Sequence, residues 1–124
     1  MSTPRLLHMT APMREDFDVP YHEFGTAGEG PSVALVAGIH GNELNGIFVL
    51  SRLAAFLRQV EKGERPDARL LGRVVVIPAV NVLGVNTRRR RWPFDGTDIN
   101  RMFPGYDAGE TTQRIASALL SATA

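Results

Sequence analysis

Residues 32–43 read SVALVAGIHGNE, an apolar run that ends in a histidine and a glutamate. The run 32–39 is continuously apolar after its first residue, which is typical of a strand covered on both faces in a parallel sheet. Beyond it, apolar residues recur every three or four positions, which predicts a helix over about residues 43–60 with one face on the sheet. Residues 73–79 (RVVVIPA) predict a second buried strand. A strand, a helix and a strand joined by short linkers predict a right-handed βαβ crossover, and therefore an α/β fold with a mostly parallel or mixed central sheet flanked by helices.

The segments on either side of this unit predict less regular structure. Residues 1–20 look irregular, and residues 19–24 predict a short edge strand. Residues 81–109 contain several glycines and prolines and predict a long loop. A loop of that length inside a compact domain is usually functional or disordered.

Helical spacing resumes near the end of the chain, over residues 111–120, with Thr111 or Thr112 as the expected N-cap. No strand signal follows this helix, so the sheet is expected to be unfinished. We therefore expect residues 1–124 to form a single partial domain, a fragment or truncated product of a longer protein.

The composition excludes several classes of protein. The chain has 44% hydrophobic and 22% charged residues, a net charge of +1 and no cysteine. Near-neutral charge gives no reason to expect nucleic acid or a membrane surface as a partner, and disulfides and thiolate metal sites are impossible. The apolar runs are shorter than the ~20 residues of a membrane span, and residues 1–13 contain no apolar signal region. We expect a cytoplasmic protein.

His40 and Glu43 are the first candidate site residues. A histidine at the end of a buried strand lies in the crevice where open α/β sheets bind ligands, and a glutamate three residues later can turn toward the same point. Imidazole nitrogen and carboxylate oxygen are standard zinc ligands. The alternative is structural: Glu43 complements the N-terminal dipole of the helix, and His40 is a hydrogen-bonded strand end.

Asn100 and Arg101 are the second candidate pair. The arginine presents a planar fork suited to a carboxylate, and the asparagine offers two amide donors beside it, so together they form a carboxylate clamp. Asp98 either orients Arg101 or caps the turn. The alternative is a surface turn with a solvated arginine.

Residues 88–91 are four consecutive arginines. They form either a solvated loop or a phosphate-contacting patch, but a neutral chain with few aromatic residues nearby argues against nucleic-acid binding. Trp92 and Phe94 are expected to anchor the loop or line a pocket. His8 and His22 have no ligand-like neighbours and are expected to be solvated or core histidines.

Three segments together resemble the succinylglutamate desuccinylase/aspartoacylase family, which is similar in fold to the zinc carboxypeptidases. They are GIHGNELNG (38–46), IPAVNVLGVN (77–86) and PFDGTDINRMFPG (93–105), and with their spacing they cover most of residues 32–115. The family has leucine where Ile99 stands here. The resemblance implies a zinc-dependent amidohydrolase, and the N-terminal part of its three-layer catalytic domain.

The resemblance also implies roles for particular residues. His40 and Glu43 match the first two zinc ligands, and Asn100 and Arg101 match the pair that holds the substrate's carboxylate. An arginine just upstream of the P-x-D-G segment stabilises the oxyanion, and Arg90 is our choice, with Arg91 as the alternative.

The family's third zinc ligand, a histidine on a later strand, and its catalytic glutamate have no counterpart in these 124 residues. We therefore expect weak or no activity from this chain alone. The expected partner is a small N-acyl amino acid, with homo-oligomer formation left open. Two other functions remain as alternatives, a non-enzymatic carboxylate-binding module and a peptide carboxypeptidase.

Overall fold

A computed structural model describes residues 5–9 and 17–123 of the chain. The strands are β1 (Arg5–Met9), β2 (Phe17–Pro20), β3 (His22–Gly25), β4 (Ser32–Val36) and β5 (Arg73–Ile77). The helices are α1 (Leu44–Glu61), α2 (Val82–Thr87), the short 3-10 turn η1 (Ile99–Arg101) and α3 (Thr111–Thr123). None of the helices in the described residues is long and apolar enough to cross a membrane.

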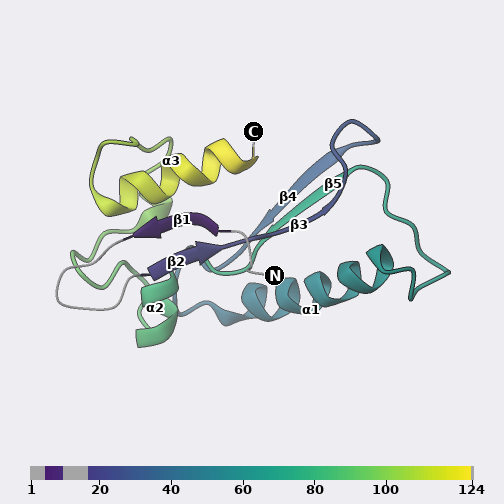
Figure 1. Ribbon diagram of the computed structural model, residues 1–124. Helices are drawn as coiled ribbons and strands as arrows, with labels where there is room; N and C mark the ends of the chain where they lie inside the picture. The colour runs from purple at the N-terminus through teal and green to yellow at the C-terminus, as the bar shows by residue number, and fades with distance from the viewer. Residues whose placement is uncertain (1–4, 10–16, 124) are drawn as a thin grey trace.

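The central sheet has three strands in the order β3-β5-β4 (Figure 1). β4 pairs parallel with β5, with Val33 opposite Val74 and Val36 opposite Ile77, whereas β3 pairs antiparallel with β5. Because β4, α1 and β5 follow one another in the chain, the parallel pair and its helix form the predicted βαβ unit. The expected α/β fold with a mixed sheet is confirmed.

Helix α1 packs along one face of this sheet (Figure 1). Its buried residues, Leu50, Ala54 and Leu57, lie three or four positions apart and contact Phe24 and Val76 of the sheet. Burial of that apolar stripe is what stabilises an amphipathic helix. The predicted bounds, 43–60, differ from the observed ones by one residue at each end.

The opposite face of the sheet carries a second core. Its buried members come from β2, β5, α2, η1, α3, the link between β5 and α2, and the loop after the arginines. They are Val19, Val75, Ile77, Val80, Leu83, Trp92, Ile99, Ile115 and Leu119. The Trp92 ring lies 5.4 Å from that of Phe17, tilted by 54°. The expectation that Trp92 anchors its loop is confirmed.

The expectation for β4 was wrong. It was predicted to be covered on both faces, but Val33 is 47% and Val36 is 36% exposed. β4 is an edge strand in the described residues, and α1 contacts β3 more extensively than it contacts β4. The prediction holds for β5, the central strand, where Val75, Val76 and Ile77 are buried.

The prediction for residues 1–20 was also wrong within the described part. β1 and β2 pair antiparallel as a separate two-stranded sheet, and Met9 and Val19 are buried. Residues 1–4 and 10–16 lie outside the described residues. The predicted strand 19–24 is divided at Tyr21 between β2 and β3, because Pro20 has no N–H with which to continue a ladder.

Residues 81–109 are not a continuous loop, since they contain α2 and η1. The fully buried Asn81 caps α2, and its Oδ1 accepts the N–H of Gly84 at 2.8 Å. Helix α3 includes both threonines that were expected to cap it, and Thr112 is buried. The Gln113 side chain accepts the N–H of Glu110 at 2.9 Å instead, which satisfies a donor just before the helix.

Candidate functional site

The candidate site begins where β4 ends. The backbone pairing between the β4 and β5 segments continues past both strands, as Asn81 N–H donates to Gly38 O at 2.8 Å. Gly38 has φ +69°, a conformation that favours glycine, and a Cβ there would lie 2.8 Å from Ala79 Cα. The strand can therefore turn sharply and present His40 at the carboxyl edge of the sheet.

Gly41 brings the arginine segment against this turn. Its N–H donates to Arg90 O at 3.1 Å, and a Cβ at position 41 would lie only 2.3 Å from Arg89 O. The Asn81 side chain also donates to Arg90 O, at 3.4 Å. Two segments about 50 residues apart are thus fixed backbone to backbone, and Arg90 lies beside the His40 turn.

His40 contacts a carboxylate at each ring nitrogen. Its Nδ1 lies 3.3 Å from Glu43 Oε2, and its Nε2 lies 2.9 Å from Asp98 Oδ1. The side chains of His40 and Asp98 are only 12% and 18% exposed. Asp98 Oδ1 also accepts the N–H of Asn100 at 3.0 Å, so it caps η1 as expected. Its side-chain partner in the described residues is His40, so of the two alternatives for Asp98 the turn cap is the one observed.

Arg90 completes this polar cluster. Its guanidinium donates to Glu43 Oε1 at 2.8 Å. The hydrogen bonds from Arg90 and then His40 hold the pKa of Glu43 below its usual range. Burial acts to raise the pKa of Asp98, but its hydrogen bonds with His40 and with the Asn100 backbone outweigh that effect and lower it.

The donor geometry at His40 and Glu43 fits a metal ion. Two ligand atoms that each lie about 2.0–2.1 Å from a tetrahedral ion are about 3.3 Å apart. The observed separation of His40 Nδ1 and Glu43 Oε2 is 3.3 Å. No group of three candidate metal ligands occurs in the described residues, so the two residues would form half of a site.

A hollow of about 320 Å³ lies at the same place, lined by residues 36–40, Glu43 and Asn100. Asn100 of the predicted clamp is therefore brought to the two candidate zinc ligands by η1. Arg101 belongs to the same turn, but it is exposed and does not line this hollow.

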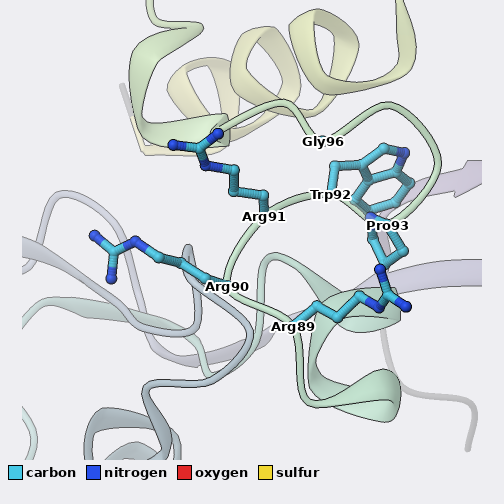
Figure 2. Close-up of a pocket in the computed structure, with 6 residues that line it drawn as sticks. All are labelled: Arg89, Arg90, Arg91, Trp92, Pro93 and Gly96. Carbon is cyan, nitrogen blue, oxygen red and sulfur yellow. The ribbon is translucent and has the colours of Figure 1, made fainter.

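The neighbouring arginines line a different hollow of about 330 Å³, together with Trp92, Pro93 and Gly96. Figure 2 shows that the side chains of Arg89, Arg90 and Arg91 point in three directions. Of these three, Arg90 is the one paired with Glu43. The structure thus brings together Arg90, His40, Glu43 and Asn100, and it does not gather the arginines into one anion site.

The remaining predictions concern Phe94, His8 and His22, which differ in how far they are buried. Phe94 is 65% exposed, with its ring edge-on to Trp92 at 6.3 Å. His8 is exposed and pairs with Asp18. His22 is half-buried, and burial, followed by repulsion from Arg58, lowers its pKa. Neither histidine lies in the candidate site, in agreement with expectation.

Sequence reasoning did not find the contact between Asp98 and His40. A signal for it exists, because a histidine that binds a metal nearly always has a carboxylate, carbonyl or water at its other nitrogen. The spacing along the chain does not say which carboxylate, since 58 residues separate the two.

The comparisons with known proteins identify the family of the chain. Residues 29–124 match the model of the succinylglutamate desuccinylase/aspartoacylase catalytic domain. The N-alpha-acetyl-L-2,4-diaminobutyric acid deacetylase of Halomonas elongata is 38% identical over 89 residues, which are 72% of this chain and 24% of that protein.

Solved structures give the same result for the fold. An aspartoacylase family protein from Mesorhizobium loti superposes with a TM-score of 0.70 at 36% identity, covering 85% of this chain and 31% of that one. The product-bound ectoine utilization protein EutE (DoeB) from Ruegeria pomeroyi gives a TM-score of 0.69 at 29% identity, covering 88% of this chain and 31% of that one. The chain spans between 24% and 31% of the length of these relatives. The predicted resemblance is confirmed, and this chain belongs to the succinylglutamate desuccinylase/aspartoacylase family.

Proposed function

We propose that this chain carries the first half of the metal site and part of the substrate site of a zinc-dependent amidohydrolase that acts on an N-acyl amino acid. The observation that carries the proposal is the 3.3 Å approach of His40 Nδ1 to Glu43 Oε2, with Arg90 bound to the same carboxylate. Zinc held there would supply the Lewis acidity that activates water and polarises an amide carbonyl.

The chain's own residues supply binding and charge. Arg90 donates to Glu43 Oε1 at 2.8 Å, and its positive charge beside this candidate metal ligand would stabilise an oxyanion that forms at the attacked carbonyl. Asn100 lines the hollow beside both ligands and, with Arg101, would hold the carboxylate of the substrate. Substrate would then lie between the η1 turn and the end of β4.

The names of the relatives favour an acyl amino acid over a peptide. The curated relative is a deacetylase of N-alpha-acetyl-L-2,4-diaminobutyric acid, so this compound is the first substrate to try. A two-ligand site binds zinc weakly, because catalytic zinc ordinarily has three protein ligands. We therefore expect weak zinc binding and little turnover from the 124 residues alone; a cytoplasmic location remains a prediction.

Calorimetric titration of the purified chain with zinc, followed by an assay for released acetate, tests the proposal. Wild type should bind one zinc weakly, His40→Ala should lose this binding, and His8→Ala should keep it, because His8 lies outside the site. Equal zinc binding by His40→Ala and wild type would overturn the metal assignment. One tight zinc site together with rapid turnover would instead overturn the expectation of a half-site.

The same variants separate the enzyme from a metal-independent carboxylate-binding module. Binding of an N-acyl amino acid is measured with and without zinc. The proposed site predicts that zinc strengthens binding by wild type and has no effect on His40→Ala. Identical affinity in all four samples would favour the binding module that uses Asn100 and Arg101 alone.

A further inference from the structure

β4 forms one outer edge of the central sheet, and in the described residues it pairs only with β5 (Figure 1). Just past the strand, Ala37 N–H donates to Ile77 O at 2.9 Å, so the backbone polar groups of position 37 face the β5 segment. The N–H and C=O of one residue in a parallel strand point to the same side, and that side alternates from residue to residue. Ser32, Ala34 and Val36 therefore direct their N–H and C=O groups toward the open edge of the sheet.

The two edges of this sheet carry different residues. β3, at the opposite edge, contains the ionisable His22 and Glu23, and Glu23 accepts from Arg73 Nε at 2.6 Å. β4 reads SVALV, and these five described residues include no charged residue, no proline and no bulge. Charged residues, prolines and bulges are the features with which natural sheets prevent an edge from pairing with another chain. The β4 edge is therefore open to pairing.

The flank of α1 on the β4 side is also apolar. Arg58 lies on the β3 side of the helix, because its guanidinium is 3.4 Å from His22 Nδ1 and 6.0 Å from the centre of the Phe24 ring. Val49 precedes Arg58 by nine positions, which are about two and a half helical turns, so it lies on the opposite side, toward β4. Val49 is 58% exposed, and the half-buried Leu53 follows it at helical spacing. An apolar helix flank thus accompanies the open strand edge.

We propose that two copies of this chain associate through their β4 edges, as an antiparallel strand pair centred on Ala34. A two-fold axis perpendicular to the sheet places Ala34 of one copy opposite Ala34 of the other, and Ser32 opposite Val36, in pairs that exchange their N–H···O bonds. A second copy is the occupant because this uncharged edge is self-complementary, and because a net charge of +1 gives little repulsion between copies. The two three-stranded sheets then form one continuous sheet, with both α1 helices on the same face.

This arrangement keeps the two candidate metal half-sites apart. His40 and Glu43 follow the carboxyl end of β4, and the carboxyl ends of two antiparallel strands point in opposite directions. Dimer formation and zinc binding are therefore independent of each other. In the monomer the outward amides of β4 are open to water, so the contact forms only as the concentration of the chain rises.

Sedimentation equilibrium of the purified chain measures the association. A single pair of five-residue strands buries less surface than a standard interface, so we expect a weak dimer that forms between about 10 µM and about 1 mM. Ala34→Lys places two like charges opposite each other at the two-fold axis and should weaken association about 5-fold or more. An equal mixture of Ala34→Lys and Ala34→Asp should restore it, which excludes misfolding as the cause. The matched control is Ala55→Lys, because Ala55 is an exposed alanine three positions before Arg58, on the β3 side of α1, and this variant should associate as wild type does.

An NMR dilution series locates the contact. The amide signals of Ser32, Ala34 and Val36 should shift with concentration, whereas those of β3 should not. A monomer at every concentration would overturn the inference and leave the edge free for a strand of a different polypeptide. Equal association of Ala34→Lys and wild type, or concentration-dependent shifts confined to residues outside β4, would also overturn it. A dimer that tightens when zinc is added would overturn the antiparallel arrangement.

Discussion

The two parallel strands β4 and β5 look alike in sequence and differ in the structure. β4 reads SVALV and β5 reads RVVVI. β5 is the central strand, and its last three residues are buried on both faces, whereas Val33 and Val36 of β4 are exposed at the edge of the sheet. An apolar run therefore indicates a strand, but its position in the sheet decides how much of it is covered.

This difference extends to the candidate site. His40 and Glu43 follow the exposed strand, whereas Arg90 and Asp98 come from the chain after the buried one. Trp92, between those two residues in sequence, belongs to the core on the β5 side. The hydrogen bonds of His40 with Asp98 and of Glu43 with Arg90 thus connect the exposed end of β4 to a segment that is anchored in the core through Trp92. The predictions below contrast the packed and open sides, beginning with the largest effect.

Removing the Trp92 side chain should have the largest effect on stability. Trp92 is almost fully buried in the core that includes Ile77 and Ile115, and loss of a buried aromatic side chain costs about 3–5 kcal/mol. Phe94, two residues on and 65% exposed, is the matched control, and Phe94→Ala should cost less than about 1 kcal/mol. Denaturant unfolding measures both. If the two variants lost similar amounts of unfolding free energy, the core would not be centred on Trp92.

The same substitution, valine to alanine, should lower the stability of the fold more in β5 than in β4. Val76→Ala removes buried methyl groups from β5 and should cost about 2–3 kcal/mol, counting both transfer and cavity. Val33→Ala, at a 47% exposed position of β4, should cost less than about 0.5 kcal/mol. The measurement is the same unfolding titration. A loss at Val33 as large as that at Val76 would contradict the edge position of β4.

Hydrogen exchange should show the same contrast without a substitution. The amides of β5 are paired on both sides, with β3 and with β4. β4 pairs only with β5 in the described residues, so the amides that face away from β5 should exchange at least about 10-fold faster than those of β5. Exchange measured by NMR residue by residue checks this. Equal protection across β4 would indicate that its outer edge is covered in solution.

The smallest expected effect is a change in the pKa of Glu43 on the open side. Its pKa is lowered first by the hydrogen bond from Arg90, so Arg90→Gln should raise it toward its usual value. A carboxyl whose folded pKa is depressed stabilises the fold above its unfolded pKa and loses that contribution as the pH falls through the folded pKa. Wild type should therefore lose slightly more stability on acidification than Arg90→Gln. Carbon-13 titration of the Glu43 carboxyl checks the pKa, with Arg91→Gln as the control that should leave it unchanged.

The parts of the fold that depend on local spacing could be predicted from the sequence. α1 and β5 follow from apolar residues at helical spacing and from a continuous apolar run, and both were placed within about two residues. The pairing of β1 with β2 could not be predicted, because the strands are only five and four residues long and their apolar pairs, such as Leu7 with Val19, are interrupted by His8 and Asp18. Likewise α2 was missed, because its cap depends on the buried side chain of Asn81.

The candidate site was likewise predictable in its residues but not in their contacts. Its members were named from motifs, and the structure brings His40, Glu43, Arg90 and Asn100 together. What the motifs could not supply is which side chain partners which, because those contacts join positions 47 to 58 residues apart.

Gly41 limits how this site can be transplanted into another protein. Its backbone lies against that of Gly84 and Arg89, where a Cβ would come within 2.3 Å of either. The backbone of the turn at residues 38–46 and that of residues 81–91 are therefore in close contact, and we expect that neither segment keeps its conformation when it is grafted alone. A chimaera that exchanges residues 38–46 with a distant relative should preserve the site only if residues 81–91 are exchanged with them.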